Sequence, residues 1–401
     1  MSVLSGKNIL LGISGGIAAY KSPLIVRLLK SQAAEVKIVM TPSAKDFVTP
    51  LTLATLSTHP VYSTFTEESQ DNHVWNDHVA LGKWADIFLI APATSNTLSA
   101  MVHAKCNNLL IATYLSCTCP VYIAPAMDLD MYAHPANQQN IKELNRIGKK
   151  VLPVGEGFLA SGLHGKGRML EPEEIIYHIS EDLKAELPLY GKKVLVTAGP
   201  TYEPIDPVRF IGNHSSGKMG FALAEEALRL GAQVTLISGP AALEASLDID
   251  RHNVVTAQDM YALALEHFTH ADIVIAAAAV ADFKPRQVGK QKIKKEGGIQ
   301  SIEFDSTRDI LSQMGQLKQK QFLVGFALET EDEQSNAIQK LKSKNLDAIV
   351  LNSLNDPGAG FSVDSNKVTY IDKNETTIPF ELKSKILVAK DIFSQILTQN
   401  A

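Results

Sequence analysis

Short apolar runs rich in β-branched residues alternate with helical patterns along most of this 401-residue chain. In the first half, the apolar runs are residues 8–11, 35–40, 87–91, 121–124 and 150–154. Continuous apolar runs of this length are typical of strands that are buried on both faces, and intervening helices make neighbouring strands parallel. The alternation therefore predicts an α/β fold built on doubly wound parallel sheets.

A polar segment at residues 181–191, which contains Pro188 and Gly191, interrupts the alternation. The pattern then restarts, with apolar runs at 193–197, 233–237, 273–277, 322–326 and 348–351. The second half is not a close repeat of the first. We therefore expect two Rossmann-like domains, one over residues 1–188 and one over residues 189–401.

Charge and cysteine content narrow the function classes. Lys and Arg number 38 and Asp and Glu number 43, so the net charge of −5 argues against nucleic acid or an anionic membrane as a partner. The longest apolar stretch, 273–281, is far shorter than the roughly 20 residues of a membrane-spanning helix. Three cysteines are too few for a disulfide framework, and Cys117 and Cys119 lack zinc-like spacing to other ligands. We expect a cytoplasmic protein that acts on small molecules.

Polar loops follow the predicted strands of the first half. Gly12–Lys21 is a glycine-rich turn before a helix, where backbone N–H groups form an anion site. It lacks the G-x-G-x-x-G spacing, so a single phosphate, as in FMN, fits as well as a dinucleotide. Ala91–Thr97 and Pro125–Tyr132 follow other strands, and Ala160–Met169 is a glycine-rich flap. Ordinary tight turns are the alternative interpretation, and a lone histidine such as His78 is more often structural than catalytic.

The second half contains a long polar string, Thr197–Gly220, after its first strand. The end of this string precedes a predicted helix, and its serines and backbone N–H groups suit a phosphate. Further on, a buried strand ends at Asp282, which could bind Mg²⁺, and small side chains before it would admit a base. Alternating lysines follow, and an extended segment would direct them to one side; a solvated basic loop is the alternative. They are Lys290, Lys292 and Lys294, with Lys295 beside them.

Two further patterns complete the second half. The string Asp305–Leu311 is expected to open a helix with Ser306 or Thr307 as its N-cap. Lys340 and Lys344 lie four residues apart and share one helix face. Exposed lysines at this spacing are usually only solvated.

These motifs resemble those of two families. Gly12–Lys21, His78–Asp86, Ala91–Thr97 and Pro125–Tyr132 resemble the flavin-dependent cysteine decarboxylases, and Thr197–Gly220 resembles the signature of phosphopantothenate–cysteine ligases. In this order the two resemble the bifunctional enzymes of coenzyme A biosynthesis. The resemblance implies a flavodoxin-like flavoprotein domain followed by a ligase domain. It also implies trimers of the flavin domain assembled into dodecamers, and dimers of the ligase domain.

The implied reactions are CTP-dependent ligation of cysteine to 4′-phosphopantothenate, followed by FMN-dependent decarboxylation to 4′-phosphopantetheine. His78 is the implied base. Asn213 is implied to hold the acyl-nucleotide intermediate, and Asp282 to bind Mg²⁺. The implied FMN contacts are Ser14, Gly15, Thr41, Ser43, Thr94, Asn96 and Thr97. The implied nucleotide contacts are Ala276, Ala277, Ala278, Asp282, Lys292, Arg308, Asp309, Ile310, Leu311, Phe326, Lys340 and Lys344.

The decarboxylase half departs from its family at two catalytic positions. Asp128 stands where the family has an asparagine, and an ionised carboxylate cannot donate a hydrogen bond to a substrate carboxylate. Ser161 stands where the family has the flap cysteine, and a hydroxyl is a poorer acid than a thiol. Our hypothesis is that His164 supplies the proton. The alternatives are an active ligase with altered decarboxylase chemistry, a non-catalytic flavin-binding half, and an NAD(P) oxidoreductase, against which the glycine spacing argues.

Overall fold

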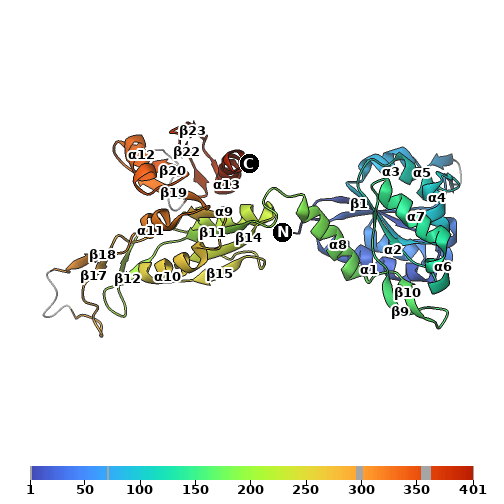
Figure 1. The fold of residues 1–401 in the computed structure, drawn as a ribbon, viewed down its shortest axis with the longest axis horizontal. Helices are drawn as coiled ribbons and strands as arrows, with labels where there is room; N and C mark the ends of the chain where they lie inside the picture. Colours follow the sequence, from blue (N-terminus) through green and yellow to red (C-terminus); the bar gives the residue numbers. More distant parts are fainter. Residues whose placement is uncertain (1, 70–71, 295–300, 354–362, 401) are drawn as a thin grey trace. The chain divides into compact units, whose positions relative to one another are not determined.

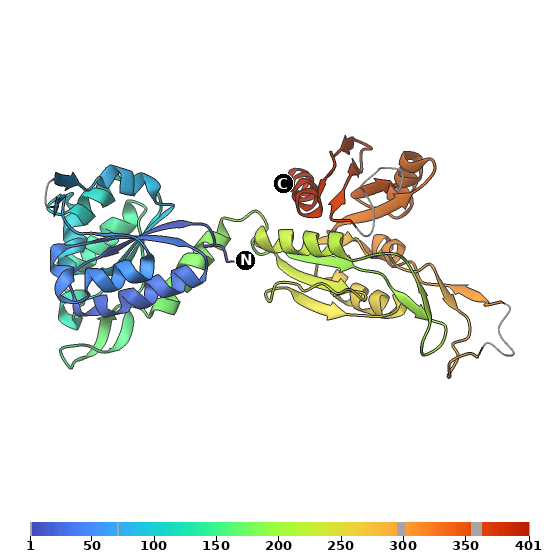
Figure 2. The same ribbon diagram turned by 180° about the vertical axis from the view of Figure 1, so that it is seen from behind.

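The computed structural model describes residues 2–69, 72–294, 301–353 and 363–400, and it divides into two compact units, Met1–Lys184 and Ala185–Ala401 (Figures 1 and 2). Each unit has its own sheet and its own hydrophobic clusters. No helix in the described parts of the chain combines the length and apolarity needed to cross a membrane.

A six-stranded parallel sheet forms the centre of the first unit. Its strand order is β3 (Val61–Tyr62), β2 (Glu35–Met40), β1 (Asn8–Ile13), β6 (Ile87–Ala93), β7 (Val121–Pro125) and β8 (Lys150–Val151). The central strands are almost entirely buried, as continuous apolar runs predict. The strand order reverses direction between β1 and β6, and ligands of doubly wound sheets bind at the carboxyl ends of strands at such a point.

Helices cover both faces of this sheet. The α1 helix (Ser22–Ser31), α2 (Pro50–Ser57) and α8 (Pro172–Ala185) pack on the face that carries Ile9 and Leu11. On the face of Leu10 and Phe88 lie α3 (His78–Trp84), α4 (Ser95–Val102), α5 (Leu109–Ser116) and α7 (Pro135–Arg146). The remaining elements are the 3₁₀ turns Ile17–Lys21 and Pro42–Asp46, α6 (Leu129–Ala133), and the hairpins β4–β5 (Thr66–Ser69, Asn72–Trp75) and β9–β10 (Gly155–Phe158, His164–Arg168).

The second unit contains an eight-stranded mixed sheet. Its order is β15 (Asp250–Asn253), β14 (Gln233–Ser238), β11 (Lys193–Ala198), β16 (Ile273–Ala276), β19 (Phe322–Glu329), β20 (Ala348–Ser353), β22 (Val368–Asp372) and β23 (Thr377–Pro379). The strands are parallel as far as β20, but β22 and β23 are antiparallel. The predicted doubly wound parallel sheet is thus extended at this edge by two antiparallel strands, of which β22 and β23 are joined by a short hairpin connection.

Helices also cover both faces of the second sheet. The α9 helix (Lys218–Arg229) and α13 (Lys385–Gln399) pack on one face, and α10 (Ala257–Phe268), α11 (Ile310–Leu317) and α12 (Glu333–Ser343) pack on the other. Three hairpins complete the unit: β12–β13 (Tyr202–Pro204, Phe210–Gly212), β17–β18 (Phe283–Pro285, Phe304–Ser306) and β21–β24 (Ser365–Asn366, Lys383–Ser384). The β17–β18 hairpin projects away from the eight-stranded sheet in both views (Figures 1 and 2).

Local details correct three sequence-based expectations. The N-cap of α11 is Asp309, whose carboxylate accepts a hydrogen bond from the Ser312 N–H at 2.9 Å, so neither Ser306 nor Thr307 caps this helix. Phe326 is the last residue of the apolar run 322–326, but it lies inside β19, because this strand continues to Glu329. Lys290, Lys292 and Lys294 are exposed and lie outside the described strands, so the alternation of an extended segment does not apply to them; Lys295 lies outside the described residues.

Candidate functional site

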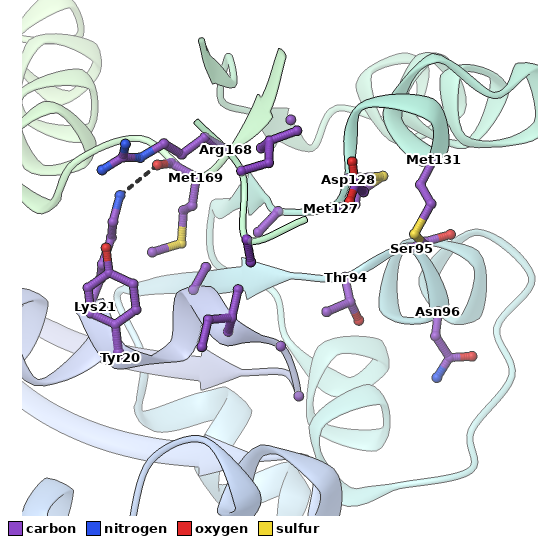
Figure 3. A pocket seen from close by; sticks show the side chains of 18 of the residues that line it. Tyr20, Lys21, Thr94, Ser95, Asn96, Met127, Asp128, Met131, Arg168 and Met169 are labelled. Atoms are coloured by element: carbon purple, nitrogen blue, oxygen red, sulfur yellow. Dashed lines mark hydrogen bonds between the residues drawn. The ribbon is translucent and has the colours of Figure 1, made fainter. Parts of the chain in front are cut away.

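A cavity of about 640 Å³ opens at the carboxyl ends of β1, β6 and β7 in the first unit (Figure 3). It is lined by the turn after β1, the start of α4, the loop after β7, and the flap that β9 and β10 form. Three of the expected flavin contacts, Gly15, Thr94 and Asn96, line it directly. The cavity therefore lies where the strand order reverses.

The turn after β1 is held tightly by hydroxyl groups. The Ser14 hydroxyl donates to the Pro92 carbonyl at 2.8 Å and accepts from the Thr94 N–H at 2.9 Å, so it joins the turn to the end of β6. Thr41 and Ser43 are hydrogen-bonded to each other at 3.2 Å beside it. A Cβ atom added at Gly15 would lie 2.4 Å from the Ser43 hydroxyl oxygen. The backbone of this turn is thus close to its neighbours, and the three hydroxyl-bearing residues border the cavity without lining it.

The start of α4 presents backbone donors to the cavity. Its N-cap is Thr94, which makes no side-chain capping hydrogen bond among the described residues and whose hydroxyl lies 3.3 Å from that of buried Thr97. Uncapped N–H groups at a helix start, together with the helix dipole, favour an anion. The hydroxyls, the glycine turn and this helix start fit the phosphate of a flavin mononucleotide.

Sequence reasoning missed Lys21, which lines the same cavity. Its side chain is only 2% exposed, and the ammonium donates to the Met169 carbonyl at 2.9 Å (Figure 3). It also donates to the Glu171 carboxylate at 2.9 Å. These partners follow the flap strand β10, so Lys21 anchors the base of the flap. The Lys21 ammonium and, to a lesser extent, Arg168 lower the pKa of Glu171. An unusually buried lysine cannot be recognised from a sequence position next to a glycine turn.

Asp128 and Ser161, at which the decarboxylase half departs from its family, lie at the flap side of the cavity together with His164. Asp128 lines the cavity and caps α6 through its carboxylate, which accepts from the Leu129 N–H at 2.6 Å. Ser161 and His164 are exposed and do not line the cavity, although neighbouring Ala160 does. The His164 ring packs edge-on against Phe158, with centroids 5.2 Å apart. The structure thus brings Asp128 to the cavity, and it places the two flap residues beside it.

His78, the implied base, lies outside the wall of the cavity. It is the first residue of α3, beside the rings of Phe65 and Trp75 at centroid distances of 6.2 and 6.4 Å. It does not line the cavity. Its Nδ1 atom is buried and has no hydrogen-bond partner among the described residues. A buried polar atom without a partner is costly, so this ring nitrogen is available for a group that is not part of the chain.

The second unit contains a cavity of about 370 Å³ at the carboxyl ends of β16 and β19. All but two of the expected nucleotide contacts line it, although they come from four separate segments of the chain. The exceptions are Ala277, which lines the neighbouring cavity, and Lys292, which is exposed on the loop after β17 and lines neither. The contacts that line it are Ala276, Ala278, Asp282, Arg308, Asp309, Ile310, Leu311, Phe326, Lys340 and Lys344.

Three cations and two carboxylates line this cavity, namely Arg308, Lys340, Lys344, Asp282 and Asp309. The Lys344 ammonium pairs with the Asp309 carboxylate at 2.8 Å, and the Lys340 ammonium donates to the Phe326 carbonyl at 2.9 Å. Burial and the nearby Lys344 lower the pKa of Lys340. Burial alone would raise the pKa of Asp309, but Lys344 and the Ser312 N–H lower it overall. Two cations held close together against their mutual repulsion are an arrangement that a polyanion stabilises.

A second cavity, of about 480 Å³, adjoins the first and shares part of its wall. The shared residues are Ala278, Val280, Asp282, Phe326 and Lys340. Asn213 lines the second cavity, and its amide donates to the carbonyls of Ala279 and Val280 at 3.2 and 2.9 Å. The start of α9 also faces it, with Gly217 at the N-cap and no side-chain cap among the described residues. An anionic substrate fits this end.

Sequence reasoning also missed Asn352, which lines the second cavity from the end of β20. Its amide oxygen is buried and accepts no hydrogen bond from the described residues. An unsatisfied acceptor in a polar cavity indicates a place where a donor of the substrate would bind. Nothing in the sequence singles out an asparagine in a run of apolar strand residues, since only the fold turns it toward the cavity.

Comparisons with known proteins agree with the two units. Residues 2–184 match the Flavoprotein family model, and residues 189–399 match the model of the DNA/pantothenate metabolism flavoprotein C-terminal domain. The chain is thus a flavoprotein joined to a pantothenate-metabolism domain. It belongs to the family of coenzyme A biosynthesis bifunctional proteins CoaBC, since it is 44% identical to the Bacillus subtilis (strain 168) member over 98% of this chain and 97% of that one.

Two other relatives are informative. A "Cysteine/Cysteine sulfinic acid decarboxylase" from an unknown prokaryotic organism is 52% identical over 88% of this chain and 99% of its own length. Among solved structures, the C-terminal domain of a coenzyme A biosynthesis bifunctional protein CoaBC is 42% identical; it covers 53% of this chain and 98% of that chain, with a TM-score of 0.46.

Proposed function

We propose that this chain ligates cysteine to 4′-phosphopantothenate at the expense of CTP, and then decarboxylates the product to 4′-phosphopantetheine with FMN. Membership of the CoaBC family supports both activities. The observation that carries the ligase assignment is the convergence of the expected nucleotide contacts on one cavity, next to the cavity that Asn213 lines.

The two adjoining cavities suit a nucleotide and an acid that must meet at one phosphorus atom. Lys340 and Lys344 would offset the charge of the triphosphate, and the start of α9 would hold the phosphate of phosphopantothenate. The shared wall would place the carboxylate of the acid against the α-phosphate of the nucleotide. Asn213 would orient the activated acyl group for attack by the cysteine amine.

Magnesium fits the nucleotide cavity through Asp282. Its carboxylate lies in the wall that both cavities share, and Mg²⁺ is commonly held by one or two carboxylates together with substrate phosphates. When bound there, Mg²⁺ would neutralise charge on the triphosphate.

The ligase proposal is tested by pyrophosphate release. We expect release that requires CTP, phosphopantothenate and cysteine together, and that is lost in the Lys340→Met variant. Replacement of CTP by ATP tests the choice of nucleotide. Pyrophosphate release that is independent of phosphopantothenate would contradict the proposal.

In the first unit, the glycine turn and the start of α4 would hold the phosphate of FMN. FMN would supply the two-electron chemistry that makes loss of CO₂ possible. The chain's own groups would position the substrate and move protons: His78 as base, Asp128 at the substrate, and Ser161 or His164 on the flap. A yellow purified protein and release of CO₂ from phosphopantothenoylcysteine are expected. If His164 is the proton donor, His164→Ala should release an oxidised enethiol product, whereas unchanged yield of the reduced product would exclude it.

A second candidate substrate is free cysteine or cysteine sulfinic acid, which occur in the name of the relative that is 52% identical. Asp128 favours this candidate, because a carboxylate in the cavity can pair with the ammonium of a free amino acid. Phosphopantothenoylcysteine has an amide in that place. CO₂ release from each substrate discriminates between them, and Asp128→Asn should shift the preference toward phosphopantothenoylcysteine.

We also propose a homo-oligomer with trimers of the flavin unit assembled into dodecamers, and dimers of the ligase unit. Large apolar side chains are exposed around the flavin cavity, with Ile17 at 60% and Tyr20 at 54% exposure, and Leu51 at 77% belongs to the same unit. In the ligase unit, Phe210 and Phe283 are 52% and 56% exposed on two hairpins. A second subunit would cover such surfaces. Sedimentation analysis tests this, and a monomer with bound flavin would contradict it.

A further inference from the structure

Cys117 and Cys119 lie together at the edge of the first unit that is opposite the flavin cavity. Cys117 directly follows α5, and only Pro120 separates Cys119 from the start of β7. The flavin cavity lies at the carboxyl ends of the parallel strands, whereas these residues lie where β7 begins. The chemistry assigned to the flavin cavity therefore does not use this pair.

The two sulfur atoms are close and their loop is fixed. The Sγ atoms are 3.0 Å apart, and both side chains are half-buried, so solvent reaches them. The Cys117 N–H donates to the Tyr114 carbonyl at 3.3 Å, and the Pro120 carbonyl accepts from the Phe88 N–H at 3.0 Å. These bonds hold the loop at both ends. A disulfide needs the sulfurs about 2.0 Å apart, so a small movement of the side chains would join them.

The contact between the two sulfurs and the nearby charges give the two thiols different pKa values. Lys149 lies beside the pair, with its ammonium 5.5 Å from the centre of the Tyr114 ring. The hydrogen bond from Cys119 and the charge of Lys149 lower the pKa of Cys117 to about 7, despite its partial burial. The same contact with Cys117, burial and the carboxylate of Asp86 raise the pKa of Cys119. Cys117 thus becomes a thiolate near neutral pH while Cys119 keeps its proton.

We propose that Cys117 and Cys119 form a thiol–disulfide exchange site for low-molecular-weight disulfides. The Cys117 thiolate attacks one sulfur of the disulfide RSSR, which forms a Cys117–SR mixed disulfide and releases RS⁻. The Cys119 thiol then loses its proton and attacks the Cys117 sulfur, which forms the Cys117–Cys119 bond and releases a second RS⁻. The protein dithiol is oxidised by two electrons and RSSR is reduced to two RS⁻. These take up the proton that Cys119 loses and the one that Cys117 lost on ionisation, so the overall exchange gives two RSH with no net release of protons.

A thiolate whose pKa lies near the ambient pH is the most effective attacking group in such exchange, which fits Cys117. The neighbouring Cys119 is placed to resolve the mixed disulfide. Cys106 is exposed and stands outside the pair, so it provides a matched control within the chain. Gly82 of α3 packs directly on the loop, since a Cβ atom there would lie 3.1 Å from the Ser116 carbonyl oxygen. Formation of a Cys117–Cys119 disulfide would therefore press on the contact between this loop and Gly82 of α3.

The test uses the full-length protein with glutathione disulfide or cystine as the oxidant, followed by acid quench, alkylation and mass spectrometry of intact chains and peptides. In wild type and in Cys106→Ser, we expect loss of two hydrogens between Cys117 and Cys119 and no lasting adduct. In Cys119→Ser, the mixed disulfide should stay on Cys117. In Cys117→Ser, Cys119 should react at least about tenfold more slowly. Reaction with only one of the two oxidants assigns that disulfide as the substrate.

Three results would overturn the proposal. One is a stable adduct on wild-type Cys117 without resolution. Another is reaction at Cys106 alone. The third is protection of both thiols by Zn²⁺ in the purified protein without loss of hydrogen, which would make the pair a metal site. Circular dichroism of each variant verifies that it is folded.

Discussion

Replacement of Lys21 by methionine tests whether this buried lysine holds the flap of the flavin cavity. Methionine keeps the length of the side chain but removes both hydrogen bonds, to the Met169 carbonyl and to Glu171. The bond from a charged donor to the Met169 carbonyl contributes about 1.5–3 kcal/mol. The ion pair contributes less than about 1 kcal/mol, because Glu171 is 46% exposed and keeps Arg168 as a partner at 2.9 Å. Relief from burying the ammonium offsets part of the loss.

We therefore expect Lys21→Met to lower the free energy of unfolding of the first unit by about 1–3 kcal/mol. For a unit of this size, that corresponds to a fall in Tm of roughly 2–12 °C. The chain's two tryptophans, Trp75 and Trp84, both lie in the first unit, so tryptophan fluorescence during urea unfolding reports on that unit alone. FMN should also dissociate more readily, because Lys21 lines the cavity.

The matched control is Glu171→Gln, which removes only the exposed half of the arrangement. It should cost less than about 1 kcal/mol, since the Met169 bond remains. The reasoning is refuted if Lys21→Met unfolds within about 0.5 kcal/mol of wild type. It is also refuted if the glutamine variant is as unstable as the methionine variant, because the carbonyl bond would then contribute nothing.

Three other substitutions probe the two cavities. Gly15→Ala should weaken FMN binding by about tenfold or more, because the new Cβ would lie 2.4 Å from the Ser43 hydroxyl oxygen. Gly16→Ala should weaken it less, because its Cβ would lie 3.2 Å from the nearest atom, the Thr94 methyl; equal losses measured by flavin fluorescence would contradict this. Lys344→Met should raise the KM for CTP by about 10- to 100-fold, because it removes a cation and leaves the Asp309 carboxylate unpaired beside the triphosphate. An unchanged KM would show that Lys344 does not contact the nucleotide. Lys340→Met should abolish pyrophosphate release. The lowered pKa of Lys340 means that its charged form carries a net burial penalty, which is present below that pKa and relieved as pH rises through it. The stability of wild type relative to the variant should therefore rise in alkaline solution, and a stability difference that does not change with pH would refute this.

The central architecture could be read from the sequence because buried parallel strands are continuous apolar runs. Strands β2 and β14 lie where those runs predict them. The antiparallel edge strands β22 and β23 were not recognised, since short edge strands carry mixed polarity and depend on their neighbours for pairing.

The candidate sites were predictable where a residue type alone suggested the chemistry, as with Asp282, Lys340 and Lys344. The structure brings these three to one cavity from distant segments. Lys21 and Asn352 could not be found in this way, because their importance arises from burial and from partners far along the chain; the carbonyl that Lys21 binds is 148 residues away. Lys292 lies on an exposed loop that lines neither cavity, so its contact with the nucleotide stays a prediction.

The wall that the two ligase cavities share limits how the enzyme could change its substrates. Asp282, Phe326 and Lys340 face both cavities, so under the proposed function a substitution there would alter the surroundings of the nucleotide and of the acid together. New preferences can therefore arise only through residues that belong to a single cavity. Variation that adapts the enzyme to another nucleotide should accumulate around Arg308, and variation that adapts it to another acid should accumulate around the start of α9.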